Sequence, residues 1–177
     1  MTRRDAQALW GLVHAERAAL VRDLEGLTDE QWRHATLCAG WDVEHVVAHL
    51  VAAATTTRFG WLRSMAGAKF DMNVHNERRL AEHLGETPAR TLENLRAVVD
   101  NSIAPTKDVA AFLGEVVVHA QDIRRPLGIA TTPAAEALTA VAEFYATKDF
   151  AVPSTSMVDG LRLRSTDGPF AHGSGPE

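Results

Sequence analysis

The chain has 177 residues, of which 46% are hydrophobic and 23% are charged. This length and balance are typical of one globular domain, and they exclude a disordered chain, a collagen-like repeat and a disulfide scaffold. The 18 basic and 23 acidic residues leave a net charge of -5, which disfavours nucleic acid and anionic membranes as partners.

The hydrophobic pattern predicts helices along most of the chain. Apolar residues recur every three or four positions, as they do on the buried face of an amphipathic helix. The predicted helices cover about residues 5–27, a short segment opened by the capping box at 28–31, and then 41–66, 73–83, 88–100, 107–125 and 133–146. Gly85, Pro105 and Pro126 stand where helices are expected to stop.

The C-terminal residues have a different character. Residues 160–164 alternate apolar and basic side chains and precede a turn at 166–168, a pattern typical of strands. We therefore expect a helical bundle over residues 1–150. Residues 151–177 are expected to form a linker and the opening strands of another module.

A single cysteine, Cys38, cannot form an intrachain disulfide or a cysteine-rich zinc site. Any metal ion would therefore be bound mainly by His, Asp or Glu, and Cys38 is interpreted as a small loop residue.

No signal-peptide core is present, and the longest weakly polar stretch, 46–54, is far shorter than the ~20 residues of a membrane span. We therefore expect a cytoplasmic protein.

One predicted helix, 107–125, carries side chains that could bind a metal ion. Glu115 and His119 are four residues apart and Asp122 follows one turn later, so the three fall within an arc of about 60°. A carboxylate and an imidazole from this helix, with a histidine from a facing helix, would give three ligands and leave one position open. Asp122 could orient His119 or contact a substrate.

The spacing leaves alternatives open. A Glu–His pair four residues apart is common on a solvated helix face, and that interpretation predicts a metal-free bundle. On the helix 41–66, His49 lies near the edge of the apolar stripe and His45 on its wetter side. These two histidines could also be paired ligands, although one exposed and one boundary histidine is the simpler interpretation. Arg124 and Arg125 complement a helix C-terminus and could bind an anionic substrate.

Two stretches resemble a known family. Residues 37–50 read LCAGWDVEHVVAHL and residues 114–128 read GEVVVHAQDIRRPLG. They resemble the two signatures of the mycothiol-dependent maleylpyruvate isomerase family, which belongs to the wider DinB-like metalloenzymes. The resemblance covers roughly residues 5–150. It implies an all-α, DinB-like four-helix bundle with short extra helices and a small β-like C-terminal tail.

By matching position, the resemblance implies that a divalent metal, usually zinc, is held by His49, Glu115 and His119. It also implies mycothiol or a similar small thiol as cofactor, and an electrophile as substrate. The reaction would be either cis–trans isomerisation or thiol transfer, because a metal ion lowers the pKa of a bound thiol and supplies thiolate. Asp122 and Arg125 are then the candidate catalytic residues.

The resemblance is incomplete at the C-terminus. Family members typically continue into a smaller α/β domain, and residues 160–177 resemble only its first strands. Either the sequence is shortened or the natural protein lacks that domain, which leaves the substrate open. The alternative hypothesis is a non-catalytic helical bundle that binds a metal or a partner chain. The sequence does not decide between a monomer and a homodimer.

Overall fold

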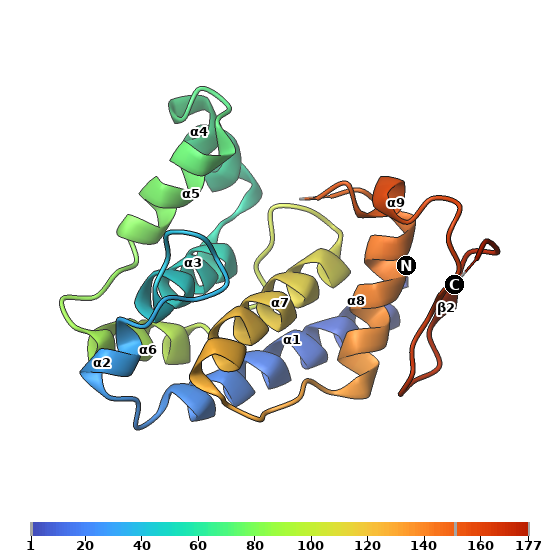
Figure 1. The fold of residues 1–177 in the computed structure, drawn as a ribbon. Helices are drawn as coiled ribbons and strands as arrows, with labels where there is room; N and C mark the ends of the chain where they lie inside the picture. The colour runs from blue at the N-terminus through green and yellow to red at the C-terminus, as the bar shows by residue number, and fades with distance from the viewer. Residues whose placement is uncertain (1, 151, 177) are drawn as a thin grey trace. The chain divides into compact units, whose positions relative to one another are not determined.

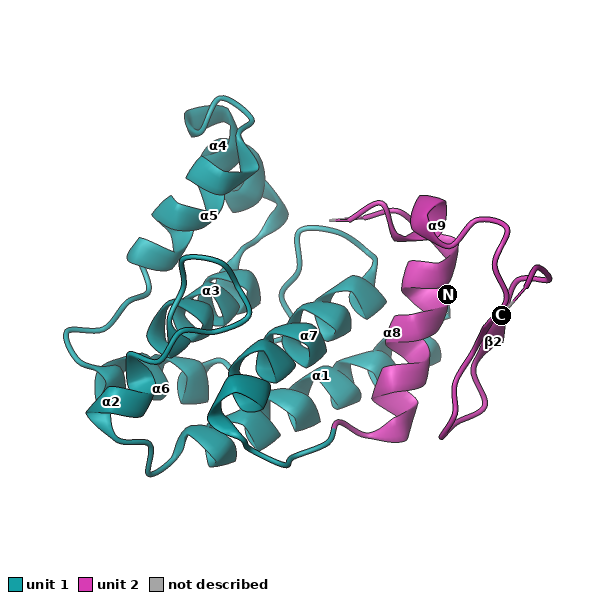
Figure 2. Cartoon of the chain, in the orientation of Figure 1, with its two compact units in different colours: residues 1–132 teal, residues 133–177 magenta. Residues whose placement is uncertain are grey.

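The structure is a computed structural model that describes residues 2–150 and 152–176. It divides into two compact units, residues 1–132 and 133–177 (Figure 2). The first contains α1 (Arg3–Leu24), α2 (Asp29–Trp32), α3 (Val43–Thr55), α4 (Arg58–Gly67), α5 (Met72–Ala81), α6 (Pro88–Ala97) and α7 (Val109–Leu127). The second contains α8 (Ala135–Thr147), α9 (Ser154–Met157), β1 (Leu163–Arg164) and β2 (Ala171–His172). Among the described residues, no helix combines the length and the apolar character that crossing a membrane requires.

Four helices form the bundle of the first unit. Both α1 and α3 pack against α6 and α7 (Figure 1). Each helix turns an apolar stripe inward because its apolar residues recur every three or four positions. The core includes Val13 and Leu20 from α1, Val46 and Leu50 from α3, Leu95 from α6, and Leu113 and Ile123 from α7. The predicted all-α bundle is therefore confirmed.

A buried ion pair joins α1 to the end of α7. The Arg124 side chain is fully buried, and its Nε and Nη2 atoms lie 2.8 and 2.7 Å from Asp23 Oδ2. The Thr131 hydroxyl donates to the other oxygen of the same carboxylate at 2.6 Å. Because a buried guanidinium without a carboxylate is strongly unfavourable, these contacts fix α1 against α7. Arg124 is therefore a packing residue and is not available to a substrate.

The continuous helix predicted over residues 41–66 is interrupted. α3 ends at Thr55, and Thr56 and Thr57 are extended before α4 begins. The Thr56 hydroxyl donates to a carbonyl one turn earlier at 2.6 Å, and the Thr57 hydroxyl accepts from the Gly60 N–H at 3.1 Å. Threonine hydroxyls compete with the helix for backbone partners. Three threonines in a row therefore end one helix and begin another.

The second unit contains the predicted last helix and the predicted strands. β1 pairs antiparallel with β2, with Leu163 opposite His172 and Arg164 opposite Ala171. The small β-like tail is therefore confirmed. α8 groups with these C-terminal residues in the second unit, while the domain boundary that the sequence places at residue 150 stays a prediction.

We expect Asp23→Asn to lower the free energy of unfolding by about 3–5 kcal/mol, because it leaves the Arg124 charge buried without a carboxylate. Chemical denaturation followed by circular dichroism measures the loss. Glu93→Gln removes a carboxylate from the exposed Arg90–Glu93 pair and is the control, with an expected change below about 1 kcal/mol. Equal losses in the two variants would contradict this role of the buried pair.

Candidate metal centre

Glu115 and His119 project from one face of α7, one turn apart, as their spacing predicts. The Glu115 side chain is 26% exposed and the His119 side chain 20% exposed. Most of each polar side chain is thus removed from water, which argues against a solvated helix face. Each nevertheless keeps an edge that a ligand could reach.

His49 reaches this face from α3. Its Nε2 atom lies 2.5 Å from Glu115 Oε1, and the same oxygen lies 3.6 Å from His119 Nε2. The His49 ring packs against Trp41 with 5.1 Å between centroids, and it meets the His119 ring edge to face at the same separation. The structure therefore brings His49, Glu115 and His119 together from two helices.

His45 does not join this cluster. It lies in the first turn of α3, where the Asp42 side chain caps the helix by accepting from the His45 N–H at 2.9 Å. The same Asp42 oxygen lies 2.6 Å from His45 Nδ1. The structure therefore favours one half-exposed histidine and one site histidine over a pair of ligands on α3.

The Glu115 carboxylate is stabilised by the two imidazoles. Burial by itself would raise the pKa of Glu115, but hydrogen bonds and charge from His119 and His49 hold this pKa well below its usual range. Burial works against the charged form of His119, yet Glu115 and Asp122 raise the pKa of His119 overall. The Glu115 carboxylate therefore favours a positive charge beside it, either a proton on an imidazole or a metal ion that displaces that proton.

The donor atoms of His49, Glu115 and His119 could hold a divalent metal ion. They all lie within 4.8 Å of one another, and ligands placed around one zinc ion at its usual bond lengths lie roughly 3.3 Å apart. Two imidazole nitrogens and one carboxylate oxygen are one of the donor sets found in open catalytic zinc sites. The donor types and their spacing therefore fit a divalent ion.

Asp122 and Cys38 lie on the other side of the His119 ring. His119 Nδ1 is 3.0 Å from Asp122 Oδ2 and 3.4 Å from Cys38 Sγ, and the thiol donates to the same Asp122 oxygen at 3.2 Å. Burial and the Asp122 carboxylate raise the pKa of Cys38 to about 12. These three donors also lie within 4.8 Å of one another. Cys38 is therefore part of the site, which its interpretation as a small loop residue missed.

A proline explains how Cys38 is brought to α7. Pro126 lies in the last turn of α7 and has no N–H to donate to the Asp122 carbonyl four residues earlier. That carbonyl instead accepts the Leu37 N–H at 3.1 Å. The sequence predicts that the helix ends before Pro126, whereas the structure keeps the proline within the last turn. The sequence shows the proline that frees a carbonyl of α7. It does not show that the Leu37 N–H is the group that bonds to this carbonyl.

Arg125 lies outside the cluster. Its side chain is exposed, and within the described parts of the chain its guanidinium makes no hydrogen bond or ion pair. The structure therefore does not bring Arg125 to the histidines, and its contact with a substrate stays a prediction.

The chain matches the family model described as the mycothiol maleylpyruvate isomerase N-terminal domain over residues 13–124, more than half of its length. The matched segment runs from α1 into α7 and includes His49, Glu115 and His119. No curated protein and no solved structure matches the chain. The match confirms the family that the two sequence stretches resemble, and the all-α DinB-like bundle with it.

We expect Pro126→Ala to loosen the loop that carries Cys38, because the substituted residue supplies an N–H that competes with Leu37 for the Asp122 carbonyl. Amide hydrogen exchange measured by NMR should then be several-fold faster at Leu37, in line with the ~1 kcal/mol of one hydrogen bond. Pro88→Ala is the control, because a proline in the first turn of α6 frees no helical carbonyl. Unchanged exchange at Leu37 would contradict this explanation.

Proposed function

Because the chain belongs to the mycothiol maleylpyruvate isomerase N-terminal domain family, we propose that it is a metal-dependent enzyme that acts on a small thiol and an electrophile. The reaction is either transfer of the thiol or cis–trans isomerisation of an activated alkene. The observation that carries the proposal is the cluster of His49, Glu115 and His119, whose donor atoms lie within 4.8 Å of one another. The cytoplasmic location and the exclusion of nucleic acid stay predictions from the sequence.

A divalent ion held by these three side chains, zinc in the first instance, would lower the pKa of a bound thiol and so supply thiolate at neutral pH. Two features of the chain favour binding of this ion. Glu115 contributes the negative charge that favours a cation between the two imidazoles. Trp41 packs against the His49 ring and limits its rotation, so that Nε2 stays directed at Glu115.

Asp122 is proposed to be a positioning residue. Its carboxylate accepts a hydrogen bond from His119 Nδ1, which places the proton on Nδ1 and leaves the Nε2 lone pair on the Glu115 side of the ring. A carboxylate behind a ligating histidine is a recurrent support of metal sites. Asp122 therefore acts through His119, while a substrate approaches from the exposed edges of Glu115 and His119.

We expect the chain, purified without a chelator or a histidine tag, to contain about one divalent ion. His49→Ala should abolish this binding because it removes a ligand. Asp122→Asn should keep the ion with about 10–100-fold lower affinity, the usual effect of removing a hydrogen-bond partner behind a ligand. Elemental analysis and titration against a competing chelator measure both effects.

The matched control for His49→Ala is His45→Ala, on the same helix, which should retain the ion because His45 contacts Asp42. Circular dichroism verifies that each variant keeps its helices. An ion retained in His49→Ala, or a wild-type chain that binds none after incubation with divalent ions, would show that the proposed ligand set is wrong.

With the ion bound, we expect the chain to accelerate either the consumption of mycothiol by an electrophile or the isomerisation of maleylpyruvate. Glu115→Gln should reduce the rate to that of the metal-free protein, because the neutral amide is a far weaker ligand than the carboxylate. Free thiol and the ultraviolet absorbance of the alkene measure the two reactions. Glu93→Gln, at an exposed position on α6, should keep the full rate.

A wild-type chain that binds the ion and yet promotes neither reaction would overturn the enzymatic proposal. That result would instead support the alternative of a non-catalytic metal-binding bundle, since the two hypotheses share the same ligands and differ only in the thiol chemistry.

A further inference from the structure

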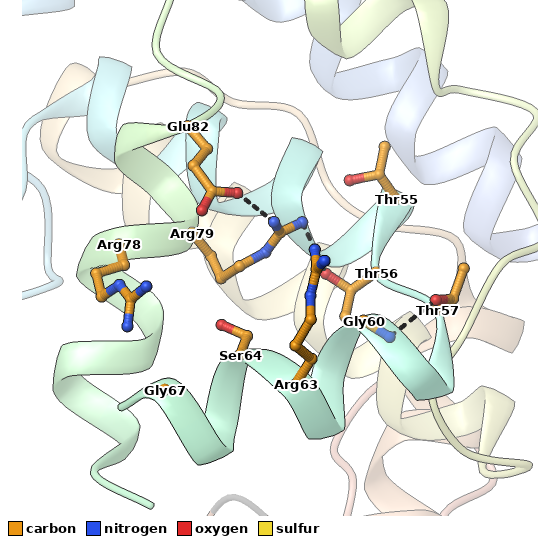
Figure 3. A pocket seen from close by; sticks show the side chains of 10 residues that line it. All are labelled: Thr55, Thr56, Thr57, Gly60, Arg63, Ser64, Gly67, Arg78, Arg79 and Glu82. Atoms are coloured by element: carbon orange, nitrogen blue, oxygen red, sulfur yellow. Dashed lines mark hydrogen bonds and ion pairs between the residues drawn. The ribbon is translucent and has the colours of Figure 1, made fainter. Parts of the chain in front are cut away.

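A polar cavity of about 490 Å³ lies between the end of α3 and the pair of helices α4 and α5 (Figure 3). Three arginines line it: Arg63 from α4, and Arg78 and Arg79 from α5. Glu82 is the one acidic side chain among the described residues that line this cavity. The chain as a whole carries a net negative charge, so this excess of positive charge is a local feature.

Arg79 and Glu82 enter the cavity from the α5 side, and Arg63 extends toward them from α4 (Figure 3). The Arg79 guanidinium is paired with the Glu82 carboxylate through Nη1, and its Nη2 lies 3.4 Å from Thr56 Oγ1. Its Nε is buried and has no hydrogen-bond partner among the described residues. A charged group with an unused buried donor is unfavourable unless an acceptor reaches it.

The other two arginines are unpaired in the part of the chain that the structure describes. Neither the Arg63 nor the Arg78 guanidinium makes an ion pair or a hydrogen bond within the described residues. Arg78 lies at the rim, where a Cβ on Gly67 would come within 3.1 Å of its Nη1 atom. The absence of a side chain at Gly67 therefore leaves room for this guanidinium against α4.

The neutral groups of the cavity wall do not balance this charge. The Ser64 hydroxyl lies 2.8 Å from His75 Nδ1, and the Thr57 hydroxyl accepts from a backbone N–H. His83, whose Nε2 lies 3.3 Å from Arg79 Nη2, has its pKa lowered by burial and by the Arg79 charge. His83 is therefore neutral near pH 7 and accepts from Arg79 without contributing a negative charge.

We propose that this cavity binds a small oxyanion, a carboxylate or phosphate group, against Arg63 and Arg79, with Arg78 at its rim. Such groups have at least two acceptor oxygens, which match the paired N–H donors of guanidinium groups. None of His49, Glu115 and His119 lines the cavity. The anion site is therefore separate from the metal centre, and the proposal does not depend on the reaction proposed above.

Calorimetric titration of the full chain with inorganic phosphate and with malonate, at constant ionic strength, tests the proposal. We expect saturable binding of at least one of the two, and the tighter one identifies the preferred class of oxyanion. Arg63→Gln and Arg79→Gln should each weaken binding about tenfold, the effect of losing one charge-assisted hydrogen bond. Arg90→Gln, an exposed position on α6 with the same change of charge, should leave the affinity unchanged.

His49→Ala, which removes a ligand of the metal centre, should also bind the anion with unchanged affinity, so that failure of one site is not mistaken for failure of the other. If Arg79→Gln does not fold, Arg63→Gln still decides the question, because Arg63 is exposed and makes no ion pair with any described residue. Absence of saturable binding in the wild type, or equal affinities in Arg63→Gln, Arg90→Gln and the wild type, would overturn the proposal.

Discussion

The arrangement of the first unit depends on the carboxylate of Glu115, which is largely removed from water. A carboxylate in this position is unfavourable unless donors or cations surround it. Glu115 finds these partners on two helices: His119 on α7 and His49 on α3. The packing of α3 against α7 places His49 opposite Glu115. The apolar core between the two helices holds them in this register.

A covalent property of proline extends this constraint to the loop before α3. Because Pro126 has no N–H, the Asp122 carbonyl is free, and it accepts the Leu37 N–H. Asp122 thus acts twice, since its carbonyl holds the loop and its carboxylate contacts both His119 and the Cys38 thiol. The position of Cys38 beside His119 is in this way linked to Pro126, at the end of the helix.

Part of this site could be predicted from the sequence because spacing within one helix fixes which side chains share a face. Glu115 and His119 share a face of α7 in any fold that keeps the helix. The choice of His49 over His45 could not be made with equal certainty from spacing, because it depends on how α3 packs against α7. The family resemblance implied His49, and the structure brings His49 next to Glu115 and His119. Its role as a ligand stays a prediction. Cys38 could not be placed at all, because its contact with His119 joins residues 81 positions apart.

The least accurate part of the predicted fold is also the part that builds the arginine cavity. In a continuous helix over residues 41–66, Arg63 would lie about 21 Å beyond His49 along the helix axis. The chain would not change direction between these two residues. Because the threonines end α3 at Thr55, α4 takes a new direction and packs against α5 (Figure 1). Arg63 then lines the same cavity as Arg79. The competition of threonine hydroxyls for backbone partners is local and weak, so hydrophobic periodicity does not reveal it. The two extended residues Thr56 and Thr57 line this cavity themselves, so the break between α3 and α4 both redirects the chain and forms part of the cavity wall.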